Sequence, residues 1–273
     1  MRRRAAAALA AFTLACCIAS SAIAAELRLG ATHTLEDSGI LPVLVAAFTK
    51  ATGIAVKPLV AGTGQVMKYA ENGDVDVVFT HSRKDEENLV ARGIGLARAD
   101  VMWNDFVIAG PQSDPARLRG GHDAAAALGR IRDARAKFVS RGDDSGTHKK
   151  ELELWTSAGG LKPWPGYVSS GQGAGRTLMM ASEMDAYDLV DRATLRQMSK
   201  RFALTVLVEG DARLLNEYGV TTLRPSPARA VRAVEAGVFA KWLVSAPARA
   251  IISGYRIEGQ RGFYLPGEKR PAG

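Results

Sequence analysis

Hydroxyl residues and glycines gather in this chain at points where a predicted strand gives way to a predicted helix. Four segments share the pattern: residues 32–34, 62–64, 140–147 and 171–175. The first N–H groups of a helix lack partners within it and lie at the positive end of its dipole, so they bind anions. Glycine lets a ligand approach the backbone closely. Together the segments predict one shared site for a small anion.

Arg141 adds a permanent positive charge to the third segment. Its planar guanidinium can bind two oxygens of an oxyanion at once. The plainer interpretation is that each Ser or Thr caps a helix and that Asp143 and Asp144 cap a turn. The convergence of four segments, one with an arginine, favours the anion site.

Catalytic and metal chemistry find less support. Ser145 follows an aspartate pair, but the hydrolase motif requires a glycine two residues before the serine. Residues 171–175 do not match the dinucleotide-binding motif. We therefore predict no catalytic residue, no resident metal and no cofactor. A secreted serine hydrolase that uses Ser145 is the alternative from another class. Metal-ligand spacing is absent among the four histidines, His33, His81, His122 and His148.

The N-terminus predicts export. Three arginines at 2–4 precede an apolar run at 5–18, and Ala-Ile-Ala at 22–24 offers a cleavage site. We expect a signal peptide at 1–24 and a periplasmic mature chain without thiols, because both cysteines lie in the leader. Lipid attachment at Cys16 is the alternative to cleavage at the Ala-Ile-Ala site. No later stretch has the roughly 20 apolar residues that a membrane span needs.

The charge balance fits an anion ligand. The chain has 36 Lys and Arg residues against 28 Asp and Glu, a net charge of +8, of which the leader carries three. A positive surplus attracts small anions. The basic residues are scattered and form no stripe with interleaved aromatics, so we do not predict nucleic-acid binding.

Strand and helix patterns alternate along the chain, which predicts parallel α/β sheets covered on both faces. We expect two lobes, one formed by 25–109 and 215–273 and the other by 110–214, with two crossing segments near 110 and 214. Ligands in such sheets bind at the carboxyl ends of strands. The predicted strands are 27–31, 54–61, 75–80, 106–110, 137–140, 202–209 and 218–223. The predicted helices are 40–52, 65–72, 85–92, 123–136, 147–158, 178–183, 192–200 and 228–243, with an ordered loop at 159–175.

Several of these segments resemble the periplasmic tungstate-binding components of bacterial ABC importers, the TupA type. The resemblance covers nearly the whole mature chain, and its most specific part is SRGDDSGTHKKE at 140–151. The resemblance implies a type II periplasmic binding fold, with two α/β lobes, each a mixed sheet flanked by helices, that close over the ligand. The other matching segments are DSGIL at 37–41, GTGQ at 62–65, ENGDVDV at 71–77, MWNDFVI at 102–108, GQG at 171–173 and LVEGD at 207–211.

The resemblance also implies the ligand contacts and the partner. Thr34 and Ser145 fit either a ligand contact or a turn and a helix cap. The family's Thr-Thr-Thr-Ser run reads Ala-Thr-His-Thr at 31–34, which leaves affinity and the choice between tungstate and molybdate open. The implied partner is the membrane permease of an ABC importer, and we expect a monomer. By resemblance, the other residues expected to contact the oxyanion, besides Thr34 and Ser145, are Thr32, Thr63, Arg141 and Thr147.

Proton chemistry separates the candidate ligands. Tungstate, molybdate and sulfate are dianions without protons at neutral pH and require donors only. Hydrogen phosphate carries a proton, so its site also benefits from an acceptor. Asp143 or Asp144 would supply that acceptor. Phosphate or a related oxyanion is therefore the nearest alternative.

Overall fold

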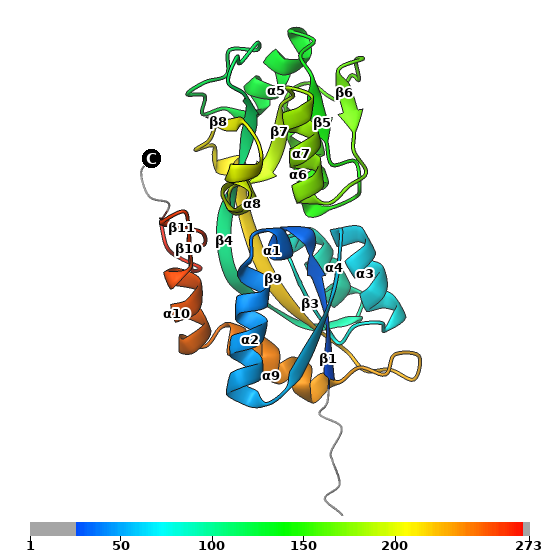
Figure 1. The fold of residues 1–273 in the computed structure, drawn as a ribbon. Helices are drawn as coiled ribbons and strands as arrows, with labels where there is room; N and C mark the ends of the chain where they lie inside the picture. Colours follow the sequence, from blue (N-terminus) through cyan, green and yellow to red (C-terminus); the bar gives the residue numbers. More distant parts are fainter. Residues whose placement is uncertain (1–25, 270–273) are drawn as a thin grey trace, which may run out of the picture.

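The computed structural model describes residues 26–269, and the predicted signal peptide and Cys16 lie outside them. Two lobes are joined by a pair of long strands (Figure 1). A seven-stranded sheet runs through both, in the order β2-β1-β3-β9-β4-β7, with β8 also paired to β4. Its strands are β1 (Glu26–Thr32), β2 (Ala55–Ala61), β3 (Val77–Thr80), β4 (Gly95–Pro111), β7 (Asp188–Asp191), β8 (Leu204–Val208) and β9 (Leu215–Leu223).

The lower lobe contains the parallel part of this sheet. β1 pairs in parallel with both β2 and β3, as the alternation of strands and helices predicts. Leu27 and Leu29 of β1 pack with Phe48 and Phe239 on one face, whereas Val66 belongs to a separate core on the other. The helices of this lobe are α1 (His33–Asp37), α2 (Ile40–Thr52), α3 (Thr63–Asn72), α4 (Arg83–Ala91), α9 (Ala233–Leu243) and α10 (Ala246–Gly254).

The two lobes are connected by β4 and β9 themselves. These strands pair in antiparallel fashion from Gly95 to Asp105 on β4. The sequence predicted only 106–110 and 218–223, because the lower part of β4 has exposed positions and charged residues instead of an apolar run. The predicted boundaries near 110 and 214 fall at the upper ends of these strands, and the division of the chain into lobes stays a prediction.

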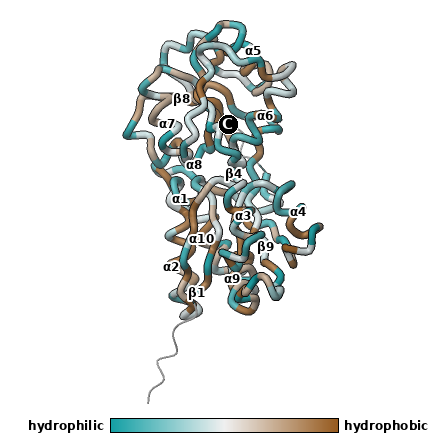
Figure 2. The backbone as a smooth tube through the Cα atoms, turned by 90° about the vertical axis from the view of Figure 1, so that its right-hand side faces the viewer, coloured by the Kyte–Doolittle hydropathy of each residue, from teal (hydrophilic) through white to brown (hydrophobic). Residues whose placement is uncertain are grey.

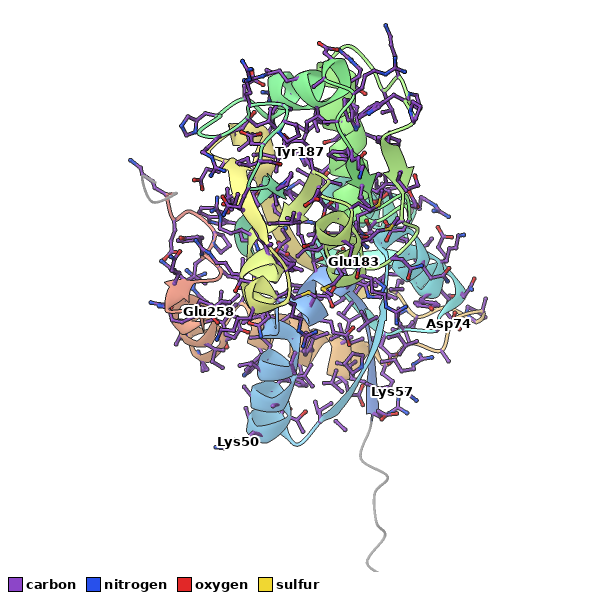
Figure 3. All side chains as sticks on the ribbon, turned by 45° about the horizontal axis from the view of Figure 1, so that its top comes forward. Lys50, Lys57, Asp74, Glu183, Tyr187 and Glu258 are labelled. Carbon is purple, nitrogen blue, oxygen red and sulfur yellow. The ribbon has the colours of Figure 1, made fainter. Side chains whose placement is uncertain are left out.

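The upper lobe continues the sheet with antiparallel pairs of β4 with β7 and β8. Phe106 and Trp155 share its main core with Tyr187, which lies inside the lobe while Lys50 and Lys57 are exposed on the lower one (Figure 3). Hydrophilic stretches follow the outer loops of this lobe (Figure 2). Its further elements are α5 (Ala124–Asp133), β5 (Phe138–Ser140), α6 (Gly146–Ser157), β6 (Tyr167–Ser169), α7 (Ala174–Glu183), α8 (Arg192–Gln197), and the 3-10 turns η1 (Ser199–Arg201) and η2 (Ala212–Leu214).

Some predicted elements are wrong in their limits. The helix predicted at 228–243 begins only at Ala233. The N–H of Arg232 donates to Asp76 Oδ1 just before β3, and the carbonyl of Ala230 accepts from Arg28 of β1, so the preceding chain is held against the sheet. The helix predicted at 192–200 ends at Gln197, and the loop predicted at 159–175 contains β6. The sequence interpretation missed α1, β7, α10 and the short hairpin of β10 (Arg256–Ile257) and β11 (Gln260–Arg261).

No helix within residues 26–269 is both long and apolar enough to cross a bilayer.

Candidate functional site

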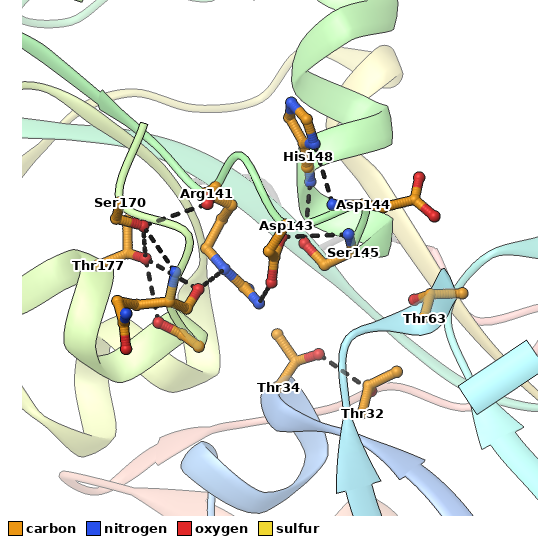
Figure 4. Close-up of polar contacts among 12 residues, drawn as sticks. Thr32, Thr34, Thr63, Arg141, Asp143, Asp144, Ser145, His148, Ser170 and Thr177 are labelled. Atoms are coloured by element: carbon orange, nitrogen blue, oxygen red, sulfur yellow. Dashed lines mark hydrogen bonds and ion pairs between the residues drawn. The ribbon is translucent and has the colours of Figure 1, made fainter. Parts of the chain in front are cut away.

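All six predicted contact residues lie at strand ends or helix starts. Figure 4 shows where the lobes meet around Thr32, Thr34, Thr63, Arg141 and Ser145. Three come from the lower lobe, where β1 ends, α1 begins and α3 begins. Three come from the upper lobe, in the turn after β5 and the first residues of α6. Each is at most 3% exposed: Thr32, Thr34, Thr63, Arg141, Ser145 and Thr147. The structure therefore brings the predicted set together, and ligand contact by each stays a prediction.

The lower-lobe hydroxyls are linked to a buried histidine that the sequence interpretation did not place in the site. The hydroxyls of Thr34 and Thr32 are 3.1 Å apart, and Thr34 Oγ1 lies 2.7 Å from His81 Nε2. His81 Nδ1 lies 2.9 Å from Asn216 Oδ1. The spacing of the histidines matches no metal-ligand pattern, but His81 directly follows the carboxyl end of β3 and reaches Thr34 from there. That position was the available signal.

Arg141 is held in place by its own lobe. Its Nε donates to the carbonyl of Gln172 at 2.8 Å, and its Nη2 donates to Asp143 Oδ2. The other oxygen of Asp143 accepts from the N–H of Ser145 at 3.1 Å. Both carboxylate oxygens of Asp143 are thus used in positioning the turn. The carboxylate of Asp144 is 70% exposed and lies 3.7 Å from Lys149 Nζ.

These contacts weaken the case for a phosphate site. Asp143 and Asp144 were the two candidate acceptors for the proton of hydrogen phosphate. The first is engaged by Arg141 and Ser145, and the second projects toward solvent. The immediate surroundings therefore favour an oxyanion that needs donors only.

Ser145 has the geometry of a helix cap. Its Oγ accepts from the N–H of His148 at 3.2 Å, and it is the N-cap residue of α6. The imidazole of His148 instead accepts from the N–H of Asp144 through Nδ1. A serine nucleophile needs a base within hydrogen-bonding reach of its hydroxyl. Across residues 26–269 no such serine–histidine contact involves Ser145, so the hydrolase alternative gains no support.

Thr147 presents a buried hydroxyl at the start of α6. Its side chain is buried in the first turn of α6, yet its Oγ1 has no hydrogen-bond partner in the part of the chain that the structure describes. A buried hydroxyl without a partner costs about 1–3 kcal/mol. An acceptor bound beside the N-terminus of α6 would remove that cost and would also meet the positive end of the helix dipole.

The lobes already touch around the site. The N–H of Gly146 donates to Thr63 Oγ1 at 2.9 Å, and the N–H of Gly64 donates to the carbonyl of Asp144 at 3.2 Å. A Cβ on Gly64 would stand 2.0 Å from Asp144 Oδ2, and one on Gly146 would stand 2.8 Å from the imidazole of His81. The buried imidazole of His81 leaves no room for a side chain at Gly146, whereas the exposed Asp144 side chain could turn away from one at Gly64.

Charged side chains join the lobes at the rim. Lys149 Nζ of α6 lies 2.7 Å from Asp85 of α4, and Lys84 Nζ lies 2.6 Å from Glu153. The N–H of Gly175, at the start of α7, donates to Asp37 of α1 at 2.9 Å. The structure is thus a closed arrangement in which segments from both lobes surround the six residues.

Arg141 provides the positive charge of the site, because the other buried titratable groups are shifted toward neutrality. Burial, assisted by the charge of Arg141, lowers the pKa of His81 to about 4. Burial raises the pKa of Asp188 well above its ordinary value, with the neighbouring Glu151 as a second cause. Burial likewise raises the pKa of Glu151, although Ser140, Tyr167 and Trp155 all donate to it.

A cavity of about 520 Å³ adjoins the site between α4 and α6. His81 and Gly146 form its inner wall, and Asp85, Lys149 and Glu153 lie along it. Within the described chain, no group of three or more His, Cys, Asp or Glu side chains is arranged to hold a metal ion.

Comparisons with known proteins agree with this geometry. A model of the PBP superfamily domain matches residues 19–247. The chain is 44% identical over 232 residues to a tungstate-binding protein TupA from Peptoclostridium acidaminophilum, covering 84% of this chain and 81% of that protein.

Two solved structures have the same fold at high sequence identity. The tungstate ABC transporter protein from Geobacter sulfurreducens is 42% identical with a TM-score of 0.78, covering 84% of this chain and 98% of that one. The tungstate-binding protein TupA from Desulfovibrio alaskensis G20 is 37% identical with a TM-score of 0.74, covering 90% and 100%. The type II periplasmic binding fold predicted from the sequence is confirmed, and the chain belongs to the PBP superfamily, within the TupA family of tungstate-binding proteins.

Proposed function

We propose that this protein is the extracytoplasmic substrate-binding component of an ABC importer and that it binds tungstate, or the isosteric molybdate, between its lobes. The ligand is a tetrahedral dianion without protons. The observation that carries the proposal is the buried hydroxyl of Thr147, which has no partner among residues 26–269 and lies in the same segment as Arg141. The names of the most similar relatives support the same ligand.

The site residues act by donating hydrogen bonds. Arg141 supplies charge and a donor, and Thr147 supplies an O–H at the start of α6. Thr32, Thr34 and Thr63 supply hydroxyls from the opposite lobe, so the anion holds the lobes together. Ser145 mainly caps α6, with its own proton still available to the ligand.

The cellular setting follows from the same proposal. The mature chain begins near Ala25 in the periplasm, acts as a monomer and delivers the anion to a membrane permease. Mass spectrometry of the exported protein tests the cleavage: a mass that starts at Cys16 with attached lipid contradicts it. Light scattering of the purified chain tests the monomer.

Calorimetric titration of the mature chain with tungstate, molybdate, sulfate and phosphate tests the ligand. We expect one site per chain and preference for tungstate or molybdate. At a concentration one hundred times its Kd, a ligand adds about 2.7 kcal/mol to the free energy of unfolding. For a chain of this size that corresponds to about 5–11 °C in Tm. A larger shift with phosphate than with tungstate refutes the proposal.

A further inference from the structure

Helices α3 and α7 begin in the same way, one in each lobe. α3 has Gly62 at its N-cap and Gly64 as its second residue, and α7 has Gly173 at its N-cap and Gly175 as its second residue. A glycine N-cap has no side chain with which to accept a hydrogen bond, and neither helix has a capping side chain from its own N-cap. The N–H groups in the first turn of each helix therefore need partners from elsewhere.

Each lobe supplies the partner that the helix of the other lobe lacks. The N–H of Gly64 donates to the carbonyl of Asp144 in the upper lobe at 3.2 Å. The N–H of Gly175 donates to Oδ2 of Asp37, on α1 of the lower lobe, at 2.9 Å. The N–H of the second residue is one of those that an N-cap side chain ordinarily binds. Asp37 thus caps α7 from the opposite lobe, with its negative charge at the positive end of the helix dipole.

The contact between α1 and α7 is close along more than one residue. A Cβ on Gly173 would stand 3.2 Å from Cγ of His33, the first residue of α1. A Cβ on Gly175 would stand 3.5 Å from Cγ of Asp37. The start of α7 therefore packs directly on α1, and this packing exists only while the two lobes are together.

The segment that leads into α7 also holds Arg141. The carbonyl of Gln172 accepts from Arg141 Nε at 2.8 Å and from Thr177 Oγ1 at 3.3 Å. Ser170 Oγ donates to the carbonyl of Arg141 at 3.2 Å and lies 2.7 Å from Thr177 Oγ1 (Figure 4). A cap on α7 therefore acts on the same segment that positions the guanidinium.

We propose that Asp37 is a positioning residue that caps α7 when the lobes close around the anion and thereby stabilises the closed, binding-competent conformation. The inference rests on the proposed function and adds a residue outside the six predicted ligand contacts. In an open conformation, water hydrates both the N–H of Gly175 and the carboxylate of Asp37. Because apparent affinity scales with the fraction of binding-competent molecules, loss of this cap weakens binding of the anion.

The expected effect is opposite in sign to simple electrostatics. Removal of a carboxylate near a bound dianion relieves repulsion and by itself strengthens binding. We nevertheless expect Asp37→Ala to weaken tungstate binding about tenfold, which equals about 1.4 kcal/mol and lies within the usual effect of an N-cap. Asp37→Asn keeps an acceptor oxygen without the charge, so its affinity should lie between those of the parent and Asp37→Ala.

Glu36 offers a matched control. It is the neighbouring acidic residue of α1, and it is exposed. Glu36→Ala removes the same charge from the same helix and leaves the cap on α7 in place. We expect its affinity for tungstate to equal or slightly exceed that of the parent.

Calorimetric titration of the mature parent and of these variants with tungstate, with a melting curve of each unliganded protein, tests the inference. The Tm of unliganded Asp37→Ala should stay close to that of the parent, because water takes the place of the cap in the open conformation. Asp37→Ala that binds as tightly as the parent, or more tightly, overturns the inference. If the parent itself does not bind tungstate, the proposed function fails instead.

Amide hydrogen exchange followed by NMR observes the cap itself. In the parent, saturating tungstate should slow the exchange of both the Gly64 and the Gly175 amides, because both lie in contacts between the lobes. In Asp37→Ala, tungstate should still slow exchange at Gly64, whose partner is a backbone carbonyl, but no longer at Gly175. Equal slowing at Gly175 in the parent and in Asp37→Ala overturns the inference, as does a Gly175 amide that tungstate leaves unchanged in the parent.

Discussion

Replacement of Arg141 by alanine should nearly abolish tungstate binding. Loss of a charged hydrogen-bond partner from a desolvated anion costs about 2–5 kcal/mol. At about 1.4 kcal/mol per tenfold, this equals a loss of affinity of roughly thirty-fold to several thousand-fold. The structure places the result in the upper part of this range, because removal of the guanidinium leaves Asp143, with a side chain 13% exposed, as an unpaired negative charge close to the dianion.

The same contacts predict a cost to the unliganded protein. From the sequence alone, an arginine that faces only a ligand is neutral for stability. Here Arg141 also donates to Gln172 and pairs with Asp143, so Arg141→Ala should lower Tm without ligand. Arg141→Lys should restore part of the affinity, since it keeps the charge but loses the planar fork.

Calorimetric titration and a melting curve for each variant test this reasoning. Arg141→Ala combined with Asp143→Asn serves as the control, because it removes the residual negative charge and should recover part of the lost affinity. If Arg141→Ala binds tungstate as tightly as the parent, the assignment of the site is wrong. If the double variant binds no better than Arg141→Ala, the charge of Asp143 is not responsible for the additional loss.

Three further predictions follow from other contacts. Thr147→Val should raise the Tm of the unliganded protein and weaken tungstate binding. It removes a buried hydroxyl that has no partner in the described part of the chain, which costs about 1–3 kcal/mol. A lower Tm together with unchanged binding would contradict the role of this hydroxyl. Burial raises the pKa of Asp188 in the folded protein. The free energy of unfolding should therefore fall as pH rises from the unfolded pKa of about 3.9 through the folded pKa. Asp188→Asn should make the plot of Tm against pH flatter over this range. The ion pair of Lys149 and Asp85 joins the lobes at the rim. Small-angle scattering should show a more compact particle with tungstate than without it, and Lys149→Ala should be less compact than the parent at subsaturating anion. Identical scattering profiles with and without ligand would exclude a hinged cleft.

Much of the lower lobe follows from sequence pattern. β1, α2, β2 and α3 fall within two residues of their predicted limits, because apolar residues recur there at strand or helix spacing and Gly53 ends α2 with a φ of 73°. The lower half of β4 escaped prediction. Arg98 and Asp100 interrupt its apolar run, and their charges are paired with Glu86 and Arg83 rather than exposed as in a loop.

The site could be predicted where chemistry is local. Arg141, Ser145 and Thr147 lie in one segment, so their proximity is dictated by the turn before α6. The contribution of His81 depends on contacts with Thr34 and Asn216, which are 47 and 135 residues away along the chain. No local pattern predicts such contacts.

The role of Asp143 could not be read from sequence either. A carboxylate in this turn is equally able to accept a ligand proton or to hold the turn. Its two oxygens accept from Arg141 and from the N–H of Ser145, so in this structure Asp143 holds the turn.

A crystal structure of the mature protein with tungstate, with diffraction data recorded at a tungsten absorption edge, tests the central claim most directly. The account predicts a single strong anomalous peak between the lobes, with oxyanion oxygens within hydrogen-bonding distance of Arg141 and of the Thr147 hydroxyl. A peak elsewhere on the protein, or no peak at saturating tungstate, would contradict it.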